Sequence, residues 1–234
     1  MDIYIIYQSK DKTRYNQYIN LFKDIKYNIH HIPVIIPKSD KDIILENITD
    51  PLTLYNIKNN ILHITNNYLN NEKQIFNTYT HVQLWQKCLE LNKPIIIIED
   101  NEFDFHKLYT SINYINKHKL PKNTHLITLI NDKYNSKPYN DYYNIILNLV
   151  GIQCYYITPN GSSILLKHAY PLSLHTDYYI NMCIMTLYLN VYRPKQILTH
   201  TYNKNYYLSY ESILKYILFV LMLCIILLIF FYIK

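Results

Sequence analysis

The hydrophobic positions of this chain form short unbroken apolar runs that alternate with longer segments of helical spacing. The clearest run lies in residues 93–105, KPIIIIEDNEFDF, where four consecutive isoleucines lead directly into a group of acidic residues. A short apolar run bounded by Pro94 and by acids is typical of a strand that is buried on both faces. We therefore expect residues 94–99 to form the central strand of a sheet, with the carboxylates at its C-terminal end.

The segment before this run has the spacing of an amphipathic helix. Between residues 71 and 92, apolar side chains recur every three or four positions, at Ile75, Tyr79, Val82, Trp85 and Leu89, and this spacing places them on one helical face.

The same alternation continues along the rest of the chain. Apolar runs predict further strands at residues 3–7, 28–37, 125–130, 155–158 and 191–198, and helical spacing predicts helices at 9–24 and 105–120, one beginning at Pro159 and one opened by Asp177. We expect irregular helix and loop at 38–70 and a polar insertion at 131–142. The pattern predicts one α/β domain with a mixed sheet, which opens with a βαβ unit of the kind that begins nucleotide-binding domains.

The acidic residues after the central strand are candidate metal ligands. In open α/β sheets ligands bind at the C-terminal ends of the strands, and carboxylates there can hold a hard divalent cation against the phosphates of a nucleotide. Glu99, Asp100 and Glu102 are the candidates. The alternative is a solvated acidic turn in which Asp104 caps the following helix.

Composition adds two facts about individual positions. The 234 residues include 27 tyrosines and only two glycines, and the abundance of Asn, Ile and Lys indicates an A/T-rich genome more than a function. Glycine is needed where φ is positive or where two backbones approach closely, so we expect Gly151 and Gly161 to occupy such positions. The four cysteines lack metal-ligand spacing and are expected to be reduced. The alternative is a disulfide between two of Cys88, Cys154 and Cys183.

The net charge of +6 favours binding to anionic partners, but it does not distinguish anionic glycans from nucleic acid or anionic lipid. The densest basic cluster in the part before the tail comprises Lys107, Lys117, Lys119 and Lys122. It is our candidate patch for sulfated glycans. The alternative is a solvated helix end whose charges suit the helix dipole.

The last part of the chain predicts a membrane anchor. Residues 216–233, YILFVLMLCIILLIFFYI, carry no charge and would span about 27 Å as a helix. With no signal-peptide pattern at the start, we expect a single-pass tail anchor. The expected division is a globular domain at 1–205 and a juxtamembrane and membrane segment at 206–234.

Two blocks of sequence resemble glycosyltransferase family 25. Residues 80–85, THVQLW, followed by 95–100, resemble the family's "Ser-His-x-x-x-Trp" helix and "Leu-Glu-Asp-Asp" strand end. Residues 151–157, then Gly161, Leu165-Leu166, Pro171 and Asp177, resemble its "Gly-x-x-x-Tyr-x-Ile…Gly-Ala…Leu-Leu…Pro-x-x-x-x-x-Asp" segment. Residues 3–14 resemble its first strand and basic turn more loosely.

This resemblance implies a single domain of glycosyltransferase-A type and a set of site residues. Arg14, His81 and Gly151 would serve the nucleotide-sugar cofactor, such as a UDP-sugar, and Asp177 would be the catalytic or acceptor-site carboxylate. Glu99, Asp100 and Glu102 would hold Mn²⁺ or Mg²⁺. The chain departs from the family pattern at Asn101, where the family has a second aspartate, and an uncharged amide weakens a metal site.

The chain also resembles poxvirus immunodominant envelope proteins, through the "His-x-x-x-Trp" helix, a valine/isoleucine strand ending in Glu-Asn-Asp, where this chain has Glu99-Asp100-Asn101, and the C-terminal membrane segment. That resemblance implies a tail-anchored protein of the virion membrane, whose glycosyltransferase-like domain binds heparan sulfate-type glycans during host attachment. We adopt this interpretation, with no nucleic acid expected as a partner. The alternative is an active metal-dependent transferase that uses a nucleotide-sugar donor.

Overall fold

The isoleucine run forms β3 (Ile95–Glu99), an interior strand of a mixed sheet. Its neighbour on one side is the parallel strand β1 (Asp2–Tyr7), and its neighbour on the other is the antiparallel strand β5 (Tyr143–Ile157). All four isoleucines are fully buried. The predicted central strand is therefore confirmed, and Glu99 ends it.

Six strands make up the sheet in this computed structural model, which describes residues 1–7, 12–23, 27–34, 41–59, 68–99, 105–186 and 188–195. The strand order is β2-β1-β3-β5-β4-β6. The remaining strands are β2 (Asn28–Pro33), β4 (Leu126–Pro138) and β6 (Val191–Pro194). The mixed α/β architecture agrees with the sequence prediction, and the compact unit comprises Met1–Ile197.

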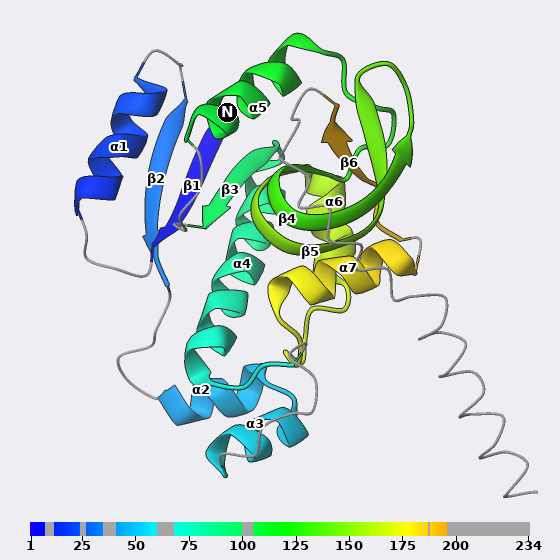
Figure 1. Cartoon of the computed structure of the whole chain (residues 1–234). Helices are drawn as coiled ribbons and strands as arrows, with labels where there is room; N and C mark the ends of the chain where they lie inside the picture. Colours follow the sequence, from blue (N-terminus) through cyan, green and yellow to red (C-terminus); the bar gives the residue numbers. More distant parts are fainter. Residues whose placement is uncertain are drawn as a thin grey trace, which may run out of the picture. The chain divides into compact units, whose positions relative to one another are not determined.

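Helices pack against both faces of this sheet (Figure 1). One face is covered by α1 (Lys12–Phe22) and α5 (Phe105–Lys117), which pack against Ile96 and Ile98 of β3. The opposite face is covered by α4 (Glu72–Leu91), α6 (Pro159–Leu166) and α7 (Thr176–Met185), which pack against Ile95 and Ile97. Successive side chains of a strand point to opposite faces, so the isoleucine run contributes to both cores.

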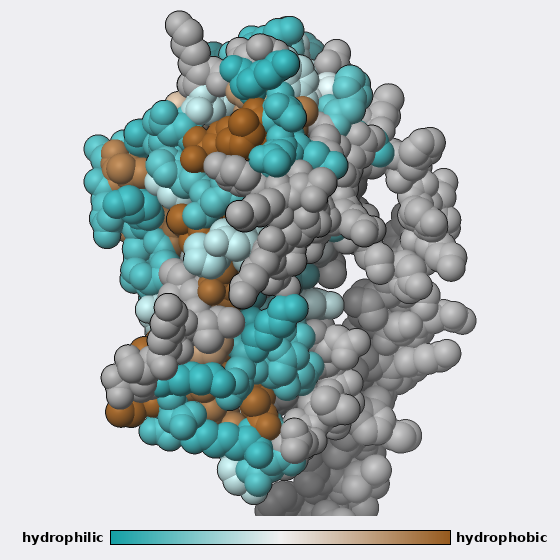
Figure 2. Space-filling view, turned by 90° about the vertical axis from the view of Figure 1, so that its left-hand side faces the viewer, coloured by the Kyte–Doolittle hydropathy of each residue, from teal (hydrophilic) through white to brown (hydrophobic). Residues whose placement is uncertain are grey.

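The segment predicted as irregular helix and loop contains two short helices, α2 (Lys41–Ile48) and α3 (Pro51–Lys58). The carboxylate of Asp50 accepts a hydrogen bond from the Thr53 backbone N–H at 2.9 Å and so caps α3. Ile43, Leu52 and Tyr55 of these helices are exposed. Figure 2 shows scattered apolar patches on one largely hydrophilic face of the molecule.

The prediction of a polar insertion at 131–142 is wrong. β4 and β5 form one long antiparallel hairpin, paired from Leu126 with Ile157 to Pro138 with Asn144. The side chain of Asn140 closes its tip by accepting the backbone N–H groups of Tyr142 and Tyr143. Residues 135 and 137–142 are exposed, so this outer part of the hairpin lacks the apolar pattern from which a buried strand is recognised.

Both glycines occupy positions that require glycine. Gly151 has φ of 77° within β5. A Cβ atom added at Gly161 would lie 2.2 Å from the backbone oxygen of His125. The expectation drawn from the scarcity of glycine is confirmed at both positions.

In the part of the chain that the structure describes, no helix is both long and apolar enough to cross a membrane. The predicted anchor at 216–233 lies outside that part, so the anchor and the domain boundary near 205 stay predictions.

Candidate functional site

A cavity of about 240 Å³ opens at the C-terminal end of β3. Four elements contribute to its wall: α4, the end of β3, the middle of β5, and the start of α7 with the residue before it. Its lining residues are Asn77, Glu99, Gly151, Ile152, Gln153, His175, Thr176 and Asp177. Most of these carry hydrogen-bonding side chains, so the cavity suits a polar ligand.

Glu99 is held in this wall by side chains of α4. Its Oε1 atom lies 2.8 Å from Nε2 of His81 and accepts a hydrogen bond from the Asn77 amide at 3.2 Å. The His81 side chain has no solvent exposure, whereas that of Glu99 is 21% exposed. The carboxylate is therefore fixed from the protein side while it borders the cavity.

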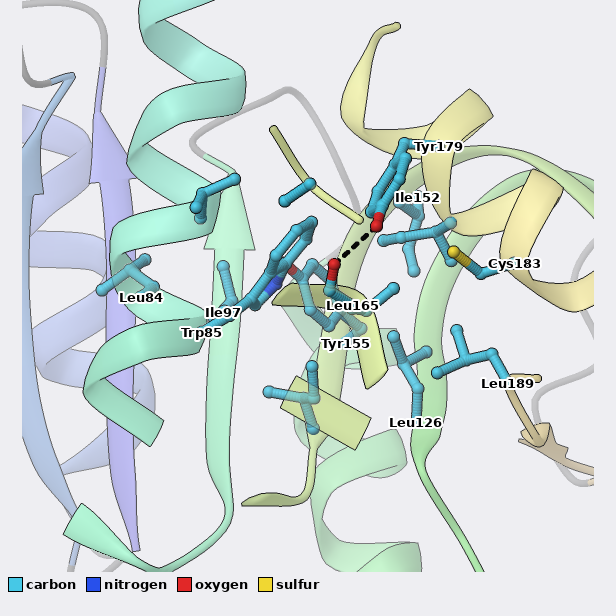
Figure 3. Close-up of a cluster of buried hydrophobic side chains, with 14 of the residues drawn as sticks. Leu84, Trp85, Ile97, Leu126, Ile152, Tyr155, Leu165, Tyr179, Cys183 and Leu189 are labelled. Carbon is cyan, nitrogen blue, oxygen red and sulfur yellow. Dashed lines mark hydrogen bonds between the residues drawn. The ribbon is translucent and has the colours of Figure 1, made fainter. Parts of the chain in front are cut away.

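Behind His81 the hydrogen bonds continue into the core. Nδ1 of His81 lies 2.8 Å from the hydroxyl of Tyr155, and the Trp85 indole N–H donates to the same hydroxyl at 2.9 Å. Figure 3 shows Trp85 and Tyr155 within the buried apolar cluster between α4 and β5. Burial raises the pKa of Tyr155 well above its ordinary value, so its hydroxyl keeps its proton.

Asp177 reaches the cavity from α7 and is tied to β5. Its Oδ2 atom accepts the Gly151 backbone N–H at 3.0 Å, and Oδ1 accepts the Tyr178 backbone N–H at 2.9 Å. The N-cap of α7 is His175, so this helix is not opened by Asp177, as the sequence pattern predicted. The carboxylate instead lies in the first turn, where the helix dipole favours a negative charge, and it joins two segments that are distant in sequence.

His175 adds a neutral imidazole to the lining. Burial lowers its pKa, while the charges of Asp177 and Glu99 and a backbone hydrogen bond at Tyr68 act in the opposite direction with smaller effect. Because a histidine with a lowered pKa is uncharged at neutral pH, its ring can exchange hydrogen bonds with a hydroxyl without adding positive charge to the cavity.

Three of the residues predicted for the site meet at this cavity: Glu99, Gly151 and Asp177. His81 lies behind the wall and reaches the cavity through Glu99, and the Gly151 N–H is already engaged by Asp177. Sequence reasoning missed Asn77, Gln153 and His175, which carry no motif signal beyond their closeness to His81, Gly151 and Asp177. Arg14 lies in α1, and its side chain is outside the described part of the chain.

The predicted metal site is described only through Glu99. Asp100 and Glu102, like the proposed cap Asp104, fall outside the described residues. No group of three or more His, Cys, Asp or Glu side chains suited to a metal ion occurs among the residues that are described. The described chain thus offers Glu99 as one oxygen ligand, of the type that Mn²⁺ and Mg²⁺ prefer.

The residues of the basic cluster do not line this cavity; two lie on α5 and two follow it. Lys117, Lys119 and Lys122 are exposed, and Lys107 is partly buried. Their binding of sulfated glycans stays a prediction.

The model of glycosyltransferase family 25 (LPS biosynthesis protein) matches residues 1–180. The chain belongs to glycosyltransferase family 25. The match extends from β1 into α7 and includes every residue that lines the cavity, which confirms the resemblance seen in the motifs. No curated protein matches the chain. The resemblance to poxvirus envelope proteins stays unconfirmed.

Proposed function

We propose that this family 25 domain, of glycosyltransferase-A type, binds the sugar of a nucleotide-sugar donor at the Glu99–Asp177 cavity and transfers it to an acceptor hydroxyl. The observation that carries the proposal is the meeting of two carboxylates at one cavity, Glu99 from the end of β3 and Asp177 from the first turn of α7. Membership of the family supplies the reaction class.

The size and lining of the cavity support a monosaccharide as the occupant. Its volume of about 240 Å³ is below the roughly 300–1,000 Å³ of pockets that enclose drug-sized ligands, so it would take the sugar and leave the nucleotide outside. Carboxylate, amide and imidazole groups can hydrogen-bond several sugar hydroxyls at once.

Asp177 is the residue that we assign to the acceptor hydroxyl. Each of its oxygens accepts one backbone N–H, and an ionised carboxylate has about four lone-pair positions in all. The backbone bonds fix the orientation of the carboxylate and leave capacity to accept a hydrogen bond from a hydroxyl or to take its proton.

A divalent cation in this site would be held by Glu99, and the carboxylates of Asp100 and Glu102 follow it in the sequence. A bound Mn²⁺ or Mg²⁺ would supply neutralisation of the charge that develops on the departing diphosphate.

The substitution Asp177→Asn tests the proposal. It keeps the shape of the side chain but removes the charge and one acceptor, so we expect release of UDP from UDP-galactose or UDP-glucose, with Mn²⁺ present, to fall by roughly 10²–10⁴-fold. Asp141→Asn, a matched change at an exposed position of the hairpin tip, should leave the rate unchanged. Equal rates for Asp177→Asn and the native chain, or no UDP release from the native chain with either UDP-sugar, would contradict the proposal.

A second candidate function is attachment to sulfated glycans by a tail-anchored envelope protein. It is supported by the exposure of Lys117, Lys119 and Lys122 around the end of α5. Basic surfaces bind sulfated polysaccharides with release of counterions, so the affinity falls steeply with salt. The membrane anchor that this role requires is checked by alkaline carbonate extraction of the full chain, and release of the chain would refute the anchor.

Heparin retention tests the attachment role. Changing Lys117, Lys119 and Lys122 to Glu should lower the salt concentration at which the full chain elutes. The matched control changes the exposed lysines Lys73, Lys137 and Lys167 to Glu, with the same change in net charge. Elution of the native chain at low salt would exclude the role, and an equal effect of both triple variants would show that overall charge, not this patch, is responsible.

A further inference from the structure

We infer that Trp85, Tyr155 and His81 form a hydrogen-bond chain of fixed direction that positions the Glu99 carboxylate in the cavity wall. The inference deepens the proposed function and rests on it for the use of Glu99. Its three residues lie inside the core and do not line the Glu99–Asp177 cavity: Trp85, His81 and Tyr155 are each fully buried. They are therefore positioning residues.

The direction of the chain follows from the chemistry of its inner end. The indole N–H of Trp85 can only donate a hydrogen bond, so the Tyr155 oxygen is the acceptor of the 2.9 Å contact. The proton of the Tyr155 hydroxyl must then find an acceptor of its own. Among the hydrogen bonds of the described residues, the partner available to it is Nδ1 of His81 at 2.8 Å.

The opposite arrangement is disfavoured by burial. If Nδ1 of His81 carried a proton and donated it to Tyr155, the hydroxyl would accept twice and its own proton would be left in the core, fully buried, without an acceptor. An unsatisfied buried donor is strongly unfavourable, because it gives up its hydrogen bond to water and receives none in return. Nδ1 is therefore the acceptor, the ring proton is on Nε2, and Nε2–H donates to Oε1 of Glu99 at 2.8 Å.

This direction gives Glu99 two converging donors. Oε1 receives the His81 Nε2–H and the Asn77 amide N–H, and the first of these is anchored through Tyr155 to the Trp85 ring, which stacks on Tyr179 at a centroid distance of 6.0 Å. A functional carboxylate is effective when its supporting residues hold it within about 0.5 Å of its working geometry. In the "His-x-x-x-Trp" helix, His81 and Trp85 therefore act together to position the Glu99 carboxylate.

Two substitutions of His81 separate the positioning role from a merely structural one. In His81→Gln the amide group can take the place of Nε2 and donate to Glu99. In His81→Asn the shorter side chain places its amide near Nδ1, so it keeps the contact with Tyr155 and loses Glu99. Both variants leave a polar group in the same core position, and thermal unfolding of each shows how far stability alone is affected.

The expected result is an asymmetry in UDP release from UDP-galactose in the presence of Mn²⁺. His81→Asn should lower kcat by roughly 10- to 100-fold, the usual cost of removing a supporting partner of a functional ligand, while His81→Gln should stay within roughly threefold of the native chain. An Asn variant as active as the Gln variant would overturn the positioning role.

NMR gives a second measurement that does not need turnover. Long-range ¹H–¹⁵N spectra of the full chain with ¹⁵N-labelled histidine should show His81 protonated on Nε2 and not on Nδ1, and the carboxyl ¹³C signal of Glu99 should move in His81→Asn but not in His81→Gln. A proton on Nδ1, or equal movement of the Glu99 signal in both variants, would refute the inference. If the native protein releases no UDP, the proposed function fails. These spectra would still decide whether the hydrogen bonds from Trp85 through Tyr155 and His81 position Glu99.

Discussion

Replacing Gly161 with alanine is expected to destabilise the domain severely, by about 3 kcal/mol or more. The added Cβ would lie 2.2 Å from the backbone oxygen of His125 and 2.8 Å from its carbonyl carbon, and a backbone group cannot turn aside as a side chain can. The same region ties α6 to β4, because the backbone N–H and the hydroxyl of Thr158 both donate to the His125 oxygen. Relieving the overlap would therefore break the contacts at the start of α6.

Urea unfolding followed by circular dichroism measures this effect. Ser163→Ala is the control, since Ser163 is exposed on the same helix and its loss should change the free energy of unfolding by less than about 0.5 kcal/mol. A Gly161→Ala variant with a midpoint close to that of Ser163→Ala would show that α6 can move away from His125 without loss.

Trp85→Ala is the second substitution from which we expect a large effect, about 3–5 kcal/mol of lost stability. Trp85 is fully buried between α4 and the sheet, and it is surrounded by apolar side chains of the cluster that Figure 3 shows. Its removal would leave a large cavity and would also leave the hydroxyl of Tyr155 without its donor.

Trp85→Phe separates these two contributions. Phenylalanine keeps an aromatic ring in the core but has no N–H, so we expect a smaller loss, of about 1–3 kcal/mol, from the lost hydrogen bond to the Tyr155 oxygen and the smaller ring. Leu89→Ala on the same helix is the control, since Leu89 is 38% exposed. A Trp85→Phe variant no less stable than Leu89→Ala would mean that the hydrogen bond to Tyr155 contributes little. Circular dichroism is the measurement of choice here, because Trp85 is the single tryptophan of the chain.

The candidate site could be predicted from the sequence only in part. Glu99 and Asp177 were identified because each stands in a recognisable context, the first after a buried strand and the second at a helix start within a family motif. Asn77 and His175 were missed, because a polar residue next to a helix start or on a half-buried helix face looks like a surface residue until the fold shows what it faces. The burial of His81 behind Glu99 is likewise not visible in the motif, which names the residue without its contacts.

The sequence by itself determined the elements whose hydrophobic pattern is strong: β3, buried on both faces, α4 before it, the alternation that makes an α/β domain, and the two positions where glycine is required. These follow from local rules, because burial on two faces, helical periodicity and backbone sterics each restrict which residue types can occur at the positions concerned. Only the tertiary structure decided that residues 131–142 extend a hairpin and that Gly151 and Asp177, 26 residues apart, are joined by a hydrogen bond. The physical reason is that polar strand pairing and long-range contacts depend on which segments meet in space, and no residue type marks such a meeting in advance.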